Sequence, residues 1–136
     1  MTCTFFGHRD CNERDLGDLK GKIVDLIENK KVFKFYVGNN GSFDRIVQKV
    51  LCELKNKYPE IEWFLVLEKL PTGEYVENSV FPEELVGVPP KFLIDRRNNY
   101  MLKNSDYVIT YVRRKYGGAA KFERKAQKWN KIVIKI

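Results

Sequence analysis

The sequence predicts a Rossmann-like α/β domain, a three-layer sandwich with a five-stranded, mainly parallel sheet. Short apolar runs alternate with longer amphipathic runs, which is the pattern of βαβ units around a parallel sheet. Glycine-containing segments follow three of the apolar runs. The chain has 136 residues, 43% of them hydrophobic, which is enough for one core, and we expect a single domain over residues 1–136.

The first half of the chain alternates strands and helices. Gly7 ends the first apolar run, and leucine and isoleucine recur on one face of the amphipathic run that follows. Ser42 is expected to cap the next helix, and Pro59 to close it. The expected elements are strands at 2–6, 32–37 and 61–67, with helices at 12–29 and from Ser42 onward.

The second half begins with a segment, 69–89, that has no clear periodicity and contains several prolines and glycines. A loop of this length inside a compact domain is often a functional lid. Pro90 is suited to the first position of a helix that runs to about Asn104. The remaining expected elements are a strand at 106–112, a helix from 117 to about 130, and a strand at 131–136.

Right-handed connections between these strands give the order 3-2-1-4-5. The first and fourth strands then flank the point where the strand order reverses. Open α/β sheets bind ligands there, at the carboxyl ends of the strands.

Charge is distributed unevenly. Residues 1–90 hold 12 basic and 15 acidic side chains, a net of −3, whereas residues 91–136 hold 13 basic and 3 acidic, a net of +10. A basic half favours an anionic partner, either a nucleotide phosphate or a nucleic acid.

The three glycine-containing segments all project from the carboxyl edge of the predicted sheet, and each leads into a helix. Glycine lets a phosphate approach the backbone, and the amides and dipole of a helix N-terminus attract anions. The segments are neither a P-loop nor a G-x-G-x-x-G motif. The candidate ligand-binding residues in them are Gly7, His8 and Arg9; Gly38, Asn39, Asn40, Gly41 and Ser42; and Gly117, Gly118, Ala119, Ala120 and Lys121.

Four of the candidate side chains suit an anionic ligand for different reasons. His8, the only histidine, is suited to donate a hydrogen bond to a phosphate or to act as an acid or base. Arg9 is suited to bidentate phosphate binding. Arg97 and Asn98 lie on the helix before the fourth strand, from which Arg97 is expected to reach across the top of the sheet.

The remaining composition argues for an intracellular protein without a metal. The three cysteines form no C-x-x-C pair, which disfavours a disulfide framework and a zinc site. No apolar run is long enough to span a bilayer, and the start of the chain lacks the features of an export signal. We therefore expect a cytoplasmic location with reduced thiols, no metal and no cofactor.

Several short motifs are distinctive when they are taken together. They are Phe5-Phe6-Gly7-His8-Arg9, Val37-Gly38, Asn40-Gly41-Ser42-Phe43-Asp44, Val88-Pro89-Pro90, Arg97-Asn98, Ser105-Asp106-Tyr107-Val108-Ile109 and Gly117-Gly118-Ala119-Ala120-Lys121. Together they resemble the SLOG superfamily of Rossmann-like domains, which includes the LOG phosphoribohydrolases and the DNA-processing protein DprA. The resemblance covers nearly the whole chain and is nearest to small bacterial and phage proteins with a Phe-Phe-Gly-His-Arg start.

The resemblance implies a nucleotide-derivative pocket. Some relatives bind ADP-ribose-type or cyclic signals made from NAD, whereas LOG enzymes cleave a base from a nucleoside monophosphate. Arg97 and Asp106 match the LOG pattern, but Arg124 occupies the position of its catalytic glutamate. Glu123 is one residue away and, on a helix, points about 100° aside. No catalytic residue is therefore assigned, and Glu123 and Arg97 are the candidates if the protein is an enzyme.

The expected function is thus binding of an ADP-ribose or cyclic ADP-ribose type of signal, as a sensor or a sequestering protein. The alternatives are a nucleotide N-glycosidase and a DprA-like nucleic-acid module. Because relatives pair through helices, the resemblance also implies a homodimer or larger assembly. Phe92, Leu93, Tyr100 and Met101 are candidates for that contact or for ordinary core packing.

Overall fold

A single six-stranded sheet organises the computed structural model, which describes residues 1–70, 73 and 77–136. Its order is β4-β3-β2-β1-β5-β6, and every neighbouring pair is parallel. The predicted α/β class and the order of the five predicted strands are therefore confirmed. The strands are β1 (Thr2–Gly7), β2 (Lys34–Val37), β3 (Glu62–Val66), β4 (Ser79–Val80), β5 (Tyr107–Tyr111) and β6 (Ile132–Lys135).

The sixth strand, β4, corrects the prediction of five. It is only two residues long, and Ser79 and Val80 pair with Leu65 and Val66 of β3 at the sheet edge. A strand this short has no readable alternation. It lies in the segment interpreted as a lid, of which 71–72 and 74–76 fall outside the described residues.

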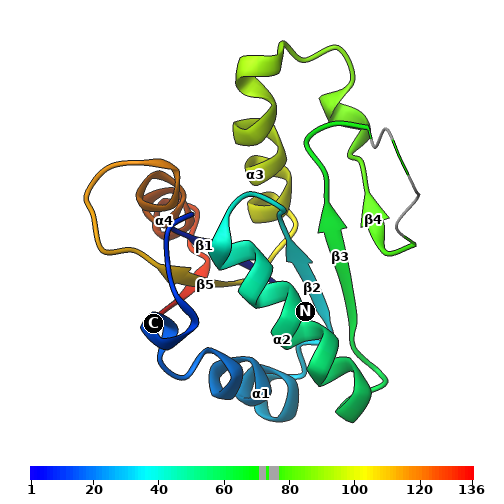
Figure 1. The fold of residues 1–136 in the computed structure, drawn as a ribbon, viewed down its shortest axis with the longest axis vertical. Helices are drawn as coiled ribbons and strands as arrows, with labels where there is room; N and C mark the ends of the chain where they lie inside the picture. Colours follow the sequence, from blue (N-terminus) through cyan, green and yellow to red (C-terminus); the bar gives the residue numbers. More distant parts are fainter. Residues whose placement is uncertain (71–72, 74–76) are drawn as a thin grey trace.

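Helices cover both faces of the sheet (Figure 1). The structure divides the predicted 12–29 helix in two, because Gly17 adopts φ +54° and ψ −123°, which no helix accommodates. The helix expected at Pro90 likewise starts as a 3₁₀ turn. The helices are α1 (Leu19–Lys30), α2 (Ser42–Lys57), α3 (Leu93–Lys103) and α4 (Gly118–Lys128), with 3₁₀ turns η1 (Glu13–Leu16), η2 (Glu83–Leu85) and η3 (Pro90–Phe92).

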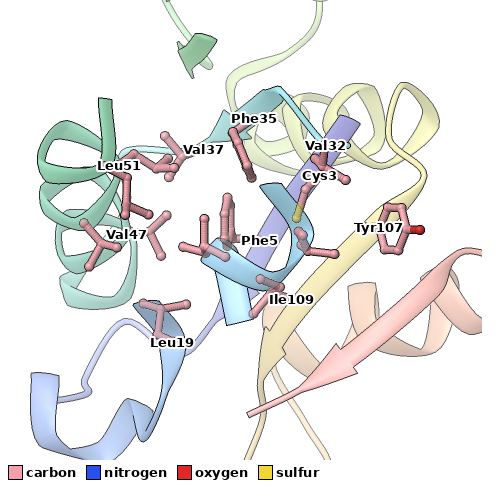
Figure 2. Close-up of a cluster of buried hydrophobic side chains, with 14 of the residues drawn as sticks. Cys3, Phe5, Leu19, Val32, Phe35, Val37, Val47, Leu51, Tyr107 and Ile109 are labelled. Atoms are coloured by element: carbon pink, nitrogen blue, oxygen red, sulfur yellow. The ribbon is translucent and has the colours of Figure 1, made fainter. Parts of the chain in front are cut away.

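Alternating side chains of the strands divide the core in two. Phe5 of β1 points to the face covered by α1 and α2, and its ring stacks on Phe35 of β2 with centroids 6.2 Å apart. Figure 2 shows these rings near Leu19 of α1 and Val47 of α2. Phe6 points to the opposite face and stacks on Phe122 of α4. The three-layer sandwich follows from this alternation.

The residues suggested for a subunit contact divide between core and surface. Met101 of α3 is buried in the core. The ring of Tyr100, from the same helix, packs against that of Tyr36, with centroids 5.8 Å apart. Phe92, in contrast, is 45% exposed. None of the helices described is long and apolar enough to cross a membrane.

Candidate functional site

A cavity of about 470 Å³ opens at the carboxyl edge of the sheet, where β1 and β5 diverge into their loops. This is the point where the strand order reverses, because the chain moves outward from β1 through β2 to β4 and then returns to β5 on the other side. The structure brings nine of the predicted site residues together in its lining: Gly7, His8, Arg9, Asn40, Arg97, Asn98, Gly117, Gly118 and Ala119.

The other six predicted residues lie beside the cavity. Asn39 accepts a hydrogen bond from Arg97, and the Lys121 ammonium pairs with Asp95 at 2.5 Å. Ala120 is buried and lines a neighbouring depression. The remaining three, Gly38, Gly41 and Ser42, hold the loop after β2 in place, as described below.

The N-terminus of α4 forms one end of the cavity. Gly117 precedes the helix with φ +91°, and no side chain among the described residues caps the first turn. Because the first amides of a helix have no intrahelical partner, those of Gly118 and Ala119 remain available to a ligand. A Cβ atom added at Gly118 would meet nothing within 4 Å, so the approach to this backbone is open. The geometry is that of a helix-terminal anion site.

Arg9 and Arg114 also line the cavity, and they differ in whether their charge is already paired. Arg9 is exposed and makes no ion pair within the described residues. Arg114 instead donates two hydrogen bonds to the Asp10 carboxylate, at 3.0 and 3.1 Å. This bond lowers the pKa of Asp10 below its usual value. Arg9 is therefore the cation whose guanidinium is free to pair with an anion.

His8 is held in its neutral form. Its Nε2 atom accepts a hydrogen bond from the backbone amide of Arg113 at 2.7 Å, so the ring proton lies on Nδ1. Burial and, next, the charge of Arg114 lower the pKa of His8. A neutral ring whose Nε2 is already occupied suits donation from Nδ1 better than proton abstraction.

The loop after β1 and the start of α2 are joined by Ser42. Gly41, with φ +96°, precedes α2, so the capping role predicted for Ser42 is wrong. The Ser42 hydroxyl donates to the Arg9 carbonyl at 2.6 Å and accepts from the Cys11 amide at 2.8 Å. A Cβ atom at Gly41 would lie 2.6 Å from the Arg9 Cα atom, so only glycine permits this approach.

The floor of the cavity contains a buried arginine. Arg97 is only 2% exposed, and its Nη1 atom donates to the carbonyl of Val66 at 3.1 Å and pairs with Glu68 at 3.4 Å. Its Nη2 atom makes no hydrogen bond to any described residue. The expected reach of Arg97 across the sheet is thus observed as far as the end of β3, with part of the guanidinium left for a ligand.

Asp44 lies next to this arginine and was not among the predicted site residues. It is 9% exposed and lines the cavity, and its Oδ2 atom accepts a hydrogen bond from the Asn40 amide at 2.9 Å. Burial raises the pKa of Asp44 to about 6, against the lowering effect of that bond and of Arg97. A Cβ atom at Gly38 would lie 2.9 Å from both Asp44 Oδ2 and Arg97 Cζ, so glycine makes this close assembly possible.

The cavity has further lining residues that were not among the predicted site residues, including Ile94, Asp95, Met101 and Tyr116. One signal pointed to Asp44: it occupies a buried position of α2 between Phe43 and Val47, where a solvated carboxylate is not expected. Nothing comparable marks the α3 residues, because their helical spacing is that of ordinary core packing.

Glu123, the carboxylate considered for catalysis, lies outside this cavity. It accepts a hydrogen bond from Thr110 Oγ1 at 2.5 Å and lies 3.9 Å from the Lys135 ammonium. It lines a separate basic depression with Arg113, Lys115 and Arg124. Within the described residues, no group of three or more His, Cys, Asp or Glu side chains is placed to hold a metal ion.

Comparison with protein-family models and with curated proteins finds no match for this chain. The fold and the cavity define the class: a Rossmann-like α/β protein with a glycine-edged cavity, lined by arginines and aspartates, at the switch point of its sheet.

Proposed function

We propose that this protein binds a phosphate-bearing nucleotide derivative, of the ADP-ribose or cyclic ADP-ribose type, as a sensor or a sequestering protein. One observation carries the proposal: the cavity joins Gly7-His8-Arg9 to the free N-terminus of α4, two segments more than 100 residues apart. Together they offer backbone amides, an unpaired guanidinium and a neutral imidazole donor at one place. Phosphate is the ligand group that uses all three.

The size and lining of the cavity support a ligand larger than inorganic phosphate. A volume of about 470 Å³ is typical of small-molecule sites. Ile94 and Tyr116 add apolar surface of the kind that packs against a base or a sugar. The resemblance of the same glycine segments to the SLOG superfamily supports a nucleotide over other phosphate esters. The three free cysteines favour a reducing, cytoplasmic location.

The experiment is a mass-spectrometric binding assay of the full chain with AMP, NAD, ADP-ribose and the cyclic ADP-ribose isomers. A ligand that binds and returns intact on denaturation supports a binding protein. Base and sugar phosphate as products would instead establish an N-glycosidase, with Asp44 or Asp95 as the carboxylate, since Glu123 lies outside the cavity. Failure of every nucleotide to bind would refute the proposal.

A matched pair of variants links binding to the cavity. Arg9→Ala removes the unpaired guanidinium, and the loss of charge-assisted hydrogen bonds worth about 1.5–3 kcal/mol weakens binding roughly 10- to 100-fold. Arg14→Ala removes an exposed arginine of η1 that does not line the cavity, and affinity stays at the wild-type value. Equal affinities in the two variants would place the ligand elsewhere.

Nucleic-acid binding is the second candidate, and the basic depression favours it. Arg113, Arg114, Lys115 and Arg124 surround a hollow of about 570 Å³ next to the main cavity. Binding of single-stranded DNA with a steep dependence on salt concentration, unaffected by Arg9→Ala, would support this function. We propose a homodimer as the assembly, with the exposed Phe92 as a contact residue, to be measured by light scattering.

A further inference from the structure

The cavity has two chemically different ends. Gly118 and Ala119 of α4 follow β5, whereas Asn40 and Asp44 follow β2, and β1 lies between those strands. Adjacent strands are about 4.8 Å apart, so the two ends are separated by roughly 10 Å. A ligand whose phosphate sits at α4 therefore needs another part to reach Asp44.

The end at Asp44 needs a hydrogen-bond donor, which phosphate does not supply. The charge of Asp44 is balanced by Arg97 and Arg9, which face it, but its carboxylate oxygens only accept hydrogen bonds, so a phosphate oxygen beside them would find no partner on Asp44. The ionised form of Asp44 thus orients the ligand, with its anionic part toward α4 and a neutral polar part that can donate a hydrogen bond toward β2.

The unused hydrogen-bonding atoms at this end define what that neutral part must be. Asp44 Oδ2 is occupied by the Asn40 amide, while Oδ1 accepts no hydrogen bond from any described residue. The Asn40 Nδ2 atom is buried and has no partner among the described residues. A buried donor left without a partner is unfavourable, so a ligand group that accepts its hydrogen bond gains affinity on binding.

An acceptor and a donor side by side need a ligand with both functions. Phosphate oxygens only accept and ammonium groups only donate, whereas a hydroxyl does both. Of two adjacent hydroxyls, one can donate a hydrogen bond to Asp44 Oδ1 and the other can accept one from Asn40 Nδ2. Gly38 keeps Asp44 packed against the backbone, since a Cβ atom there would lie 2.9 Å from Oδ2, and this fixes the carboxylate in advance of binding.

We infer that Asp44 and Asn40 bind the vicinal hydroxyls of a ribose, so that the site selects ribonucleotides over 2′-deoxyribonucleotides. The inference rests on the proposed function and adds the group that the β2 end of the cavity recognises. Asp44 is the acceptor for one hydroxyl, and Asn40 is the donor to its neighbour.

The test is calorimetric titration of the full chain with ADP-ribose and its 2′-deoxy analogue, and with AMP and 2′-deoxy-AMP. Wild-type protein is expected to bind each ribonucleotide about 10- to 100-fold more tightly than its deoxy analogue, which is the range given by one lost buried hydrogen bond. In Asp44→Asn the ratio falls to below threefold. Asp25→Asn, which removes an exposed carboxylate of α1 away from the cavity, keeps the wild-type ratio.

The outcomes separate the inference from the proposed function. Nucleotides that bind with equal ribo and deoxy affinities would overturn the inference and leave the proposed function standing. An unchanged ratio in Asp44→Asn would overturn it as well, and absence of all nucleotide binding would overturn both. If Asp44→Asn does not give a cooperative thermal melt, Asn40→Ala decides in its place: a ratio reduced several-fold supports the inference, and a wild-type ratio overturns it.

Discussion

Replacement of Gly118 by aspartate places one negative charge at the end of the cavity assigned to phosphate. The substitution fits the fold, because a Cβ atom there meets nothing within 4 Å and the residue does not have a positive φ. Gly118 is the first residue of α4, where an acidic side chain interacts favourably with the helix dipole by about 0.3–1 kcal/mol. The thermal midpoint is therefore expected to stay constant or rise slightly.

The expected loss of affinity follows from the charge alone. Two like charges about 4 Å apart repel by roughly 1 kcal/mol in water and 4 kcal/mol at an effective dielectric constant of about 20. Gly118 is exposed at the rim, which places the repulsion between these limits, at about 2 kcal/mol. This corresponds to a roughly 30-fold weaker binding of ADP-ribose.

The assay is calorimetric titration of Gly118→Asp and Gly118→Asn in parallel. Asparagine has the same size and no charge, so it controls for bulk at the cavity mouth. The difference in ligand affinity between the two variants should decrease as the salt concentration is raised from about 0.01 M to 1 M, because the Debye length falls from roughly 30 Å to 3 Å. Equal affinities of the two variants at low salt would refute the placement of a phosphate at α4.

Two further predictions concern the floor of the cavity. Gly38→Ala is expected to destabilise the protein by about 1–3 kcal/mol in urea denaturation, because the added Cβ atom would lie 2.9 Å from Asp44 Oδ2 and Arg97 Cζ. Gly118→Ala is the control, and it is expected to change the free energy of unfolding by less than about 0.5 kcal/mol, because its Cβ atom meets nothing within 4 Å. Burial raises the pKa of Asp44, which is faced by Arg97, Arg9 and Glu68, from its ordinary value of about 4 to about 6 in the folded protein. Its contribution to stability is therefore full below about pH 4 and is lost as the pH rises through 6. Asp44→Asn should remove this component, and parallel stability curves of the two proteins between pH 4 and 7 would contradict the raised pKa.

The sequence predicted most of the sheet because each long strand is a distinct apolar run. Tyr107–Tyr111 is buried at every position, and its place beside β1 follows from the connection rules. The short β4 strand was missed because two residues carry no period. The break at Gly17 was missed because a single glycine is often tolerated within a helix, and only its backbone angles reveal the interruption.

The sequence predicted that the glycine segments meet at one edge of the sheet, but it did not predict which residues form the floor of the cavity. Gly117 and Gly118 were found because loops after parallel strands meet at one edge. Asp44 was missed as a site residue, since a carboxylate in a first helical turn has a local explanation in the helix dipole. Asp44 is buried because it packs against Gly38 and Arg97. Arg97 is 59 residues from Gly38 in the sequence, so no local sequence pattern predicts that these residues meet.

The hydrogen bonds of the Ser42 hydroxyl couple the two segments that form one rim of the cavity. It is bonded on one side to the carbonyl of Arg9 and on the other to the amide of Cys11, while its own amide donates to the same carbonyl at 2.9 Å. Displacement of either the loop after β1 or the first turn of α2 breaks hydrogen bonds that hold the other. Local unfolding at this rim is therefore cooperative, and a ligand that immobilises Arg9 also slows amide exchange at the start of α2.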